Sequence, residues 1–247
     1  MMDFTQIMGV GMMTYIVMAA VVATAAFLQG VGGVGFAMLA APVAVMIAPE
    51  MVPGSLLVLG GSVSFLAAVR ERHAIVMPVV NSALVGRVAG TLLAAIGMTQ
   101  LSSQGLGLLF GGFILIAVLL SASGMRVKPT VTNVCGLGVV SGVMGTLTSV
   151  GAPALAIAMQ SLKPDQLRPS LGGTLFVGAL VSIISLAFAG LFSWKDLRLG
   201  LALWPFMYLG FQFSSRARHA VSPKNIRLFL LVFCGLSSVI LIVKSLI

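Results

Sequence analysis

Ten apolar runs fill most of the sequence and exclude a water-soluble fold. Hydrophobic residues make up 59% of the 247 residues and charged residues only 8%, whereas about a quarter of the residues of a soluble domain are charged. The runs have the length of helices and lack the alternation of barrel strands, so we expect an all-α transmembrane bundle. The expected runs are 8–28, 34–48, 54–69, 74–98, 105–124, 133–149, 152–161, 170–192, 197–215 and 226–247.

Two of these runs, 34–48 and 152–161, are shorter than the roughly 20 residues that a bilayer span needs. Each follows a turn of small residues, at 30–35 and at 146–151. Glycine in such a turn tolerates positive φ and leaves backbone N–H groups uncovered. A helix that begins there directs its free N–H groups and its positive dipole end into the turn. Both turns therefore predict an anion-binding arrangement.

The similarity between the two parts of the chain extends past the turns. The segments PEMVPGSL (49–56) and PDQLRPSL (164–171) both contain a proline, an acid, a second proline and a Ser-Leu pair that opens the next run. We expect two homologous halves, 1–128 and 129–247, within one membrane domain. Each half has five elements, an odd number, so the halves are inverted relative to each other. This design, with about eight full spans and two short hairpin helices, is typical of secondary transporters.

The basic residues predict the orientation of the chain. If the runs alternate, three basic residues (Lys195, Arg198 and Lys244) fall on one side and ten on the other. The ten are Arg70, Arg72, Arg126, Lys128, Lys163, Arg168, Arg216, Arg218, Lys224 and Arg227. Cytoplasmic loops carry the excess of Lys and Arg, so we expect both termini outside the cytoplasmic membrane. The formal charge of +9 then indicates orientation and not binding to nucleic acid.

The remaining basic residue, Arg87, lies near the middle of the run 74–98. A cation at this depth costs at least about 2.5 kcal/mol, so it should face a cavity or a partner. The planar paired donors of a guanidinium suit a tetrahedral oxyanion. The alternatives are that Arg87 reaches a membrane surface or caps the carbonyls of another helix. Gly86 and Gly90 predict close packing against a neighbouring helix.

Uncharged donors beside the turns complete the predicted substrate site. Hydroxyl and amide groups can replace part of the hydration shell of an anion; in the alternative, Thr and Ser bond the preceding turn of their own helix. The predicted site residues are Arg87, Gln29, Gly32, Gly33, Gly35, Thr146, Thr148, Ser149 and Gly151.

The acidic residues argue against an enzyme and against a proton relay. Asp3, Glu50, Glu71, Asp165 and Asp196 all lie at run ends or in loops. No cluster of His, Cys and acids is present, so we predict neither a metal nor another cofactor. An anion that leaves a negative interior gains about 2.3 kcal/mol per charge per 100 mV. Export can therefore proceed on the membrane potential alone.

The first turn, the run GVMGTLTSVG (142–151) and the doubled architecture resemble the TauE/SafE family, the sulfite exporters. The resemblance covers nearly the whole chain. It implies transport of small sulfur-containing anions, such as sulfite, sulfonates or sulfoacetate, across a prokaryotic cytoplasmic membrane. The second turn of the family usually has Gly-Gly where this chain has Ala152-Pro153. An anion channel and a carrier for another small organic anion are the alternatives. Substrate, direction and oligomeric state are left open.

Overall fold

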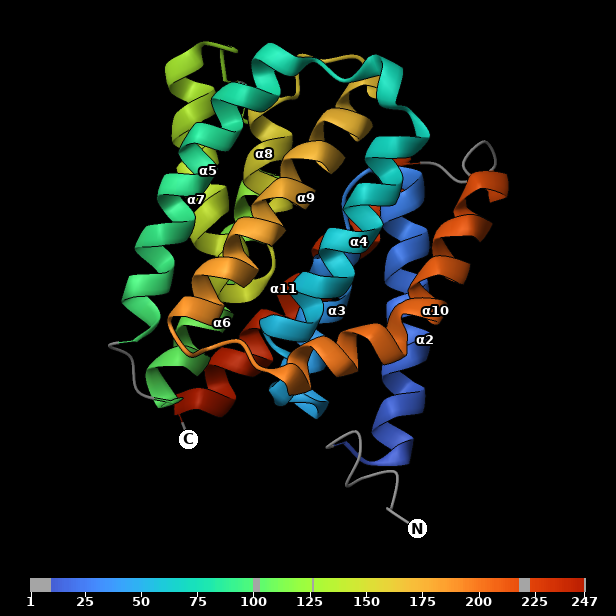
Figure 1. Ribbon diagram of the computed structural model, residues 1–247, viewed down its shortest axis with the longest axis vertical. Helices are drawn as coiled ribbons and strands as arrows, with labels where there is room; N and C mark the ends of the chain where they lie inside the picture. The colour runs from blue at the N-terminus through green and yellow to red at the C-terminus, as the bar shows by residue number, and fades with distance from the viewer. Residues whose placement is uncertain (1–9, 100–102, 126, 218–222, 247) are drawn as a thin grey trace.

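A computed structural model describes residues 10–99, 103–125, 127–217 and 223–246. In this part of the chain the structure consists of ten α-helices and two short 3-10 helices, without strands (Figure 1). Each of the ten apolar runs corresponds to one α-helix, which confirms the all-helical prediction. The helices are α2 (Met12–Gly32), α3 (Phe36–Ile47), α4 (Gly54–Arg70), α5 (Met77–Met98), α6 (Ser103–Ala122), α7 (Val131–Thr148), α8 (Ala152–Ala158), α9 (Pro164–Phe188), α10 (Trp194–Ala217) and α11 (Pro223–Leu246).

The two short helices begin directly after the predicted turns. α2 ends where Gly33 adopts a left-handed conformation (φ +79°), and Gly35 (φ +136°) precedes α3. Glycine enters this region without the steric cost that a Cβ brings. The second turn uses Ser149 in the left-handed region (φ 63°) before α8 begins at Ala152. The small residues therefore break the helices within the predicted turns, but each turn is shorter than predicted. Residues 30–32 still belong to α2 and residues 146–148 to α7.

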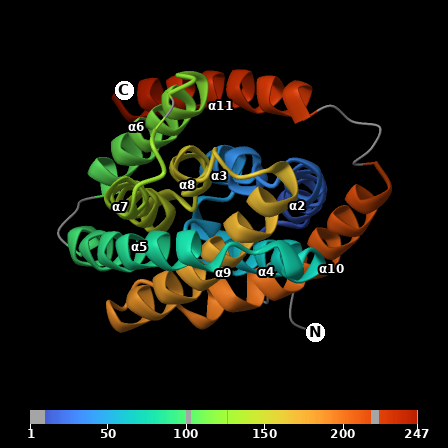
Figure 2. The ribbon, with the colours of Figure 1, turned by 90° about the horizontal axis from the view of Figure 1, so that it is seen from above.

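The long helices pack in pairs, and the short helices lie between them. α5 packs on α7, α2 on α10, α4 on α9 and α6 on α11. Viewed from above, α3 and α8 occupy the centre of the molecule (Figure 2). α3 contacts α2 and α11, whereas α8 contacts α7 and α6. The turns that precede the two short helices are consequently enclosed by other elements.

Glycines on both helices allow the close approach of α5 and α7. A Cβ at Gly86 would collide with the carbonyl of Cys135, and a Cβ at Gly90 would collide with that of Val139. On the facing helix, Gly138 contacts the backbone of α5 in the same way. The expected packing role of Gly86 and Gly90 is thus confirmed, and small residues allow such contacts in membranes.

Four helices are long and apolar enough to cross a membrane: α2, α5, α7 and α9. Four further apolar segments are shorter, at 36–47, 54–70, 109–122 and 228–243. Large apolar side chains such as Val85, Ile96 and Leu236 are exposed on the outside of the bundle. An apolar exterior of this kind suits lipid and not water. These features are those of a helical membrane protein, and the count of eight full spans stays a prediction.

The two ends of the bundle can be told apart in Figure 1. α4 ends and α9 begins at the upper end of the view, whereas α2 begins and α11 ends at the lower end. Arg70 and Arg168 therefore lie at the upper end. Two of the ten basic residues assigned to this side, Arg126 and Arg218, lie outside the described residues.

Candidate functional site

A small cavity of about 30 Å³ lies where the two turns meet. It can hold no more than about two water molecules. Gly35 and Phe36 line it from the first turn, Ser149 and Val150 line it from the second, and Arg87 reaches it from α5. Residues of α2, α3, α4, α8 and α9 supply the remaining walls, and most of them are apolar. α8 has only seven residues, and it serves here as part of the wall.

Arg87 is buried, with 2% of its surface exposed. Its Nη1 donates to the carbonyl oxygen of Ser141 at 3.2 Å and also to the hydroxyl of Ser141. Its Nε is buried without a hydrogen-bond partner. No ion pair between Arg87 and a carboxylate is present among the described residues. The bond to the Ser141 carbonyl is the alternative in which Arg87 bonds a carbonyl of another helix. The charge itself still has no counter-charge, and a buried charge of this kind is costly.

Three glycines provide the space that the guanidinium occupies. A Cβ at Gly145 would lie 2.9 Å from Nη2, and a Cβ at Gly151 would lie 2.7 Å from Nη1. A Cβ at Gly178 would overlap Nε. These glycines come from α7, the second turn and α9. A side chain at any of them would displace the charge of Arg87.

Gln29 connects three helices at the cavity and has 4% of its surface exposed. Its Oε1 accepts from the backbone N–H of Phe36 at 3.1 Å. Its Nε2 donates to the hydroxyl of Ser64, on α4, at 3.0 Å. The side chain thereby satisfies the N–H of the first residue of α3, one of the groups that lack an acceptor within their own helix.

The hydroxyl residues of the second turn have different surroundings. Ser149 lines the cavity, and its hydroxyl donates to the carbonyl of Pro53 at 3.2 Å. The Thr148 hydroxyl donates to the Met144 carbonyl at 2.7 Å. Thr148 therefore bonds the preceding turn of its own helix, as the alternative to a role in the site predicts. Thr148 is not among the residues that line the cavity.

Thr146 also lies away from the cavity, between α7, α5 and α9. Its Oγ1 donates to Oγ1 of Thr91 at 3.2 Å and lies 2.8 Å from Oγ of Ser182. These hydrogen bonds to α5 and α9 satisfy the buried hydroxyl of Thr146, so no ligand is needed to explain its burial.

The glycines of the first turn do not share one environment. Gly35 lines the small cavity, whereas Gly32 lines a larger one of about 460 Å³ between α3, α6, α8 and α11. Gly33 packs against the side chain of Arg168. A Cβ on Gly33 would lie 2.9 Å from Cγ of Arg168. Of the predicted site residues, the structure thus brings Gln29, Gly35, Arg87 and Ser149 to one cavity, with Gly151 against the guanidinium. Gly32, Gly33, Thr146 and Thr148 lie elsewhere.

Sequence reasoning missed Ser64, Ser141, Gly145 and Gly178, although all four contact Gln29 or Arg87. Ser141 also donates its hydroxyl to the carbonyl of Gly151 at 2.7 Å. Isolated small residues in apolar helices occur throughout this sequence. Only their distance from Arg87 and Gln29 distinguishes these four.

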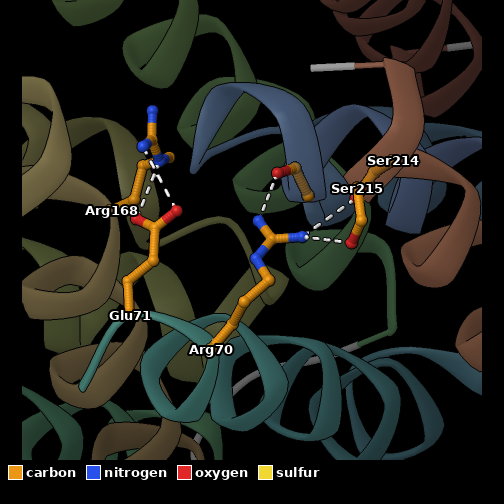
Figure 3. A network of polar contacts seen from close by, with 6 residues as sticks. Arg70, Glu71, Arg168, Ser214 and Ser215 are labelled. Carbon is orange, nitrogen blue, oxygen red and sulfur yellow. Dashed lines mark hydrogen bonds and ion pairs between the residues drawn. The ribbon is translucent and has the colours of Figure 1, made fainter. Parts of the chain in front are cut away.

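The end of α4 is tied to three other helices by the polar network in Figure 3. Arg70 donates to the carbonyl of Gly30 at 2.5 Å and to the hydroxyls of Ser214 and Ser215, both at 3.2 Å. Glu71 accepts from Nε and Nη2 of Arg168 at 3.0 and 3.2 Å. The network joins α2, α4, α9 and α10 at the upper end of the bundle in Figure 1.

The family model described as Sulfite exporter TauE/SafE matches residues 17–241. This range includes both turns and Arg87. No curated protein and no solved structure matches the chain.

Proposed function

The chain belongs to the TauE/SafE family of sulfite exporters, and we propose that it carries sulfite or a small organosulfonate, such as sulfoacetate, out of the cell. Membership of the family indicates a membrane transporter of sulfur-containing anions and not an enzyme. The export direction and the choice among these anions are our proposal.

Arg87 is the observation that carries the proposal. It is buried beside a cavity, without a carboxylate partner in the described part of the chain, and its Nε has no acceptor. An oxyanion in this cavity would supply the missing counter-charge. Hydrogen bonds between charged groups are roughly twice as strong as those between neutral groups.

The arrangement of the helices supports a transporter made of two inverted halves, 1–128 and 129–247. α5 packs on α7 as α10 packs on α2, and α3 contacts α11 as α8 contacts α6. The remaining long pairs, α4 with α9 and α6 with α11, join corresponding helices of the two halves. When each helix is replaced by its counterpart in the other half, the same set of contacts results. We propose that α3 and α8 are the hairpin helices and that the other eight helices span the cytoplasmic membrane, with both termini outside.

The small cavity favours a carrier over an open channel. A space of about 30 Å³ has to enlarge before an oxyanion enters it, so each transported ion requires movement of the walls. Movement of this kind gives saturable flux. The inside-negative membrane potential drives an anion outward.

The experiment uses purified protein in proteoliposomes loaded with radiolabelled sulfite. Efflux should saturate, and sulfoacetate on the same side should compete with it. Arg87→Ala should abolish efflux, whereas Arg72→Ala, at an exposed arginine, should leave it unchanged. Wild-type efflux from Arg87→Ala would overturn the proposed site, and efflux that never saturates would favour the channel.

A further inference from the structure

The first N–H group of α3 faces the cavity but is not open to a ligand. Phe36 lines the cavity, and its backbone N–H donates to Oε1 of Gln29 at 3.1 Å. This amide oxygen occupies the position in which an oxygen of a bound anion would meet the helix N-terminus. The guanidinium of Arg87, whose charge has no carboxylate partner among the described residues, lies at the same cavity.

The second turn is built differently at the corresponding position. Alignment of Gly30 with Thr146 places Gln29 opposite Gly145. Gly145 has no side chain, and the guanidinium of Arg87 fills the space, with Nη2 2.9 Å from where a Cβ would lie. A neutral amide therefore occupies the first turn, whereas a cation occupies the second. The site is asymmetric although the two turns correspond in sequence.

We propose that Gln29 is a specificity-determining residue whose amide oxygen is displaced by the transported anion. An oxygen of the anion takes the Phe36 N–H, and the amide of Gln29 turns so that Nε2 donates to the anion. The hydroxyl of Ser64, which accepts from Nε2 at 3.0 Å, is the group that this rotation releases. This inference rests on the proposed function, because it assigns a role at the same cavity.

The proposal predicts a specific effect of charge at position 29. Gln29→Glu retains the length and shape of the side chain, and its carboxylate can accept from the Phe36 N–H. The added negative charge would be stabilised by the N-terminus of α3 and would supply the counter-charge that Arg87 lacks. The variant should therefore fold and should exclude the substrate anion.

The test measures the rise in melting temperature of purified protein on addition of sulfite or sulfoacetate. Gln29→Glu should melt no lower than wild type without anion, and its affinity for both anions should fall at least 100-fold. Gln212→Glu makes the same chemical change at an exposed glutamine of α10, and it should bind as wild type does. Binding by Gln29→Glu within threefold of wild type would overturn the proposal.

Two further variants keep the outcomes distinct. Gln29→Met retains the length of the side chain without an amide. It should insert into the membrane normally and bind both anions at least tenfold more weakly. Unchanged affinity would again overturn the proposal. Arg87→Ala should lose binding. If Arg87→Ala binds the anions as wild type does, or if the wild type binds neither anion, the proposed function fails and this inference fails with it. If Arg87→Ala loses binding while Gln29→Glu binds normally, only the role of Gln29 is wrong.

Discussion

Gly178 of α9 lies against Nε of Arg87 so closely that a Cβ on the glycine would overlap that nitrogen. The two residues belong to different halves of the chain and are far apart in sequence. The position of Arg87, the one arginine that is buried among the described residues, thus depends on the absence of a side chain on another helix.

Gly178→Ala should displace the guanidinium and raise the KM for sulfite at least tenfold in proteoliposomes. Gly173→Ala is the matched control, because it is on the same helix and a Cβ there meets nothing within 4 Å. The control should transport normally. Equal KM values for the two variants would show that Arg87 tolerates the added methyl group.

Arg87→Lys should reduce the rate of transport sharply while the amount of protein in the membrane stays the same. Lysine retains the charge but loses the planar paired donors of the guanidinium. Initial rates, normalised to the amount of protein in the proteoliposomes, measure the effect; a wild-type rate would indicate that charge alone is sufficient.

Gly151→Ala should weaken anion binding because its methyl group would lie 2.7 Å from Nη1 of Arg87. The backbone of Gly151 has φ −91°, which any residue adopts, so the effect is on the guanidinium and not on the turn. Thr148→Ala should leave affinity unchanged, since Thr148 lies outside the cavity. Gly136→Ala, where a Cβ meets nothing within 4 Å, is the control. Anion-induced shifts in melting temperature measure all three, and normal affinity in Gly151→Ala would refute the prediction.

Gly35→Val should destabilise the first turn itself. Gly35 has φ +136°, and a Cβ there would lie 2.9 Å from Cδ1 of Leu230. A β-branched residue cannot adopt this conformation without strain. The melting temperature without anion should fall, which separates this variant from Gly151→Ala. A normal melting temperature would show that the turn can rearrange.

Glu71 and Arg168 should show coupling in a double-mutant cycle. Their side chains are 16% and 24% exposed, and a pair of this kind contributes up to about 1 kcal/mol. Glu71→Arg and Arg168→Glu should each lower the melting temperature, and the combined exchange should restore part of the loss. Arg72→Glu, at the exposed neighbouring residue, should have little effect. Additive losses would indicate that the ion pair does not tie α4 to α9.

The orientation can be tested with single cysteines in a variant in which Cys135 and Cys234 are replaced by alanine. Ser193 and His73 are both exposed, and the predicted topology places them on opposite sides of the membrane. An impermeant maleimide should label Ser193→Cys in intact cells and His73→Cys only in opened cells. Labelling of both in intact cells would contradict the predicted topology.

The sequence alone determined the helices, the approximate places of the two breaks and the position of Arg87 near the middle of a long apolar helix. These features are local, because the length of an apolar run decides whether it forms a membrane helix and glycine decides where the backbone can turn. The close-packing role of Gly86 and Gly90 was also predictable, because two small residues four apart lie on one face of a helix.

Only the tertiary structure decided which polar residues face the cavity. Thr148 and Ser149 are neighbours in sequence, yet one bonds its own helix and the other lines the cavity, because the left-handed backbone at Ser149 redirects the chain. Gly178 and Ser141 surround Arg87 through the packing of α5 against α7 and α9. A contact between helices depends on how each is rotated about its axis, and no local pattern in the sequence records that rotation.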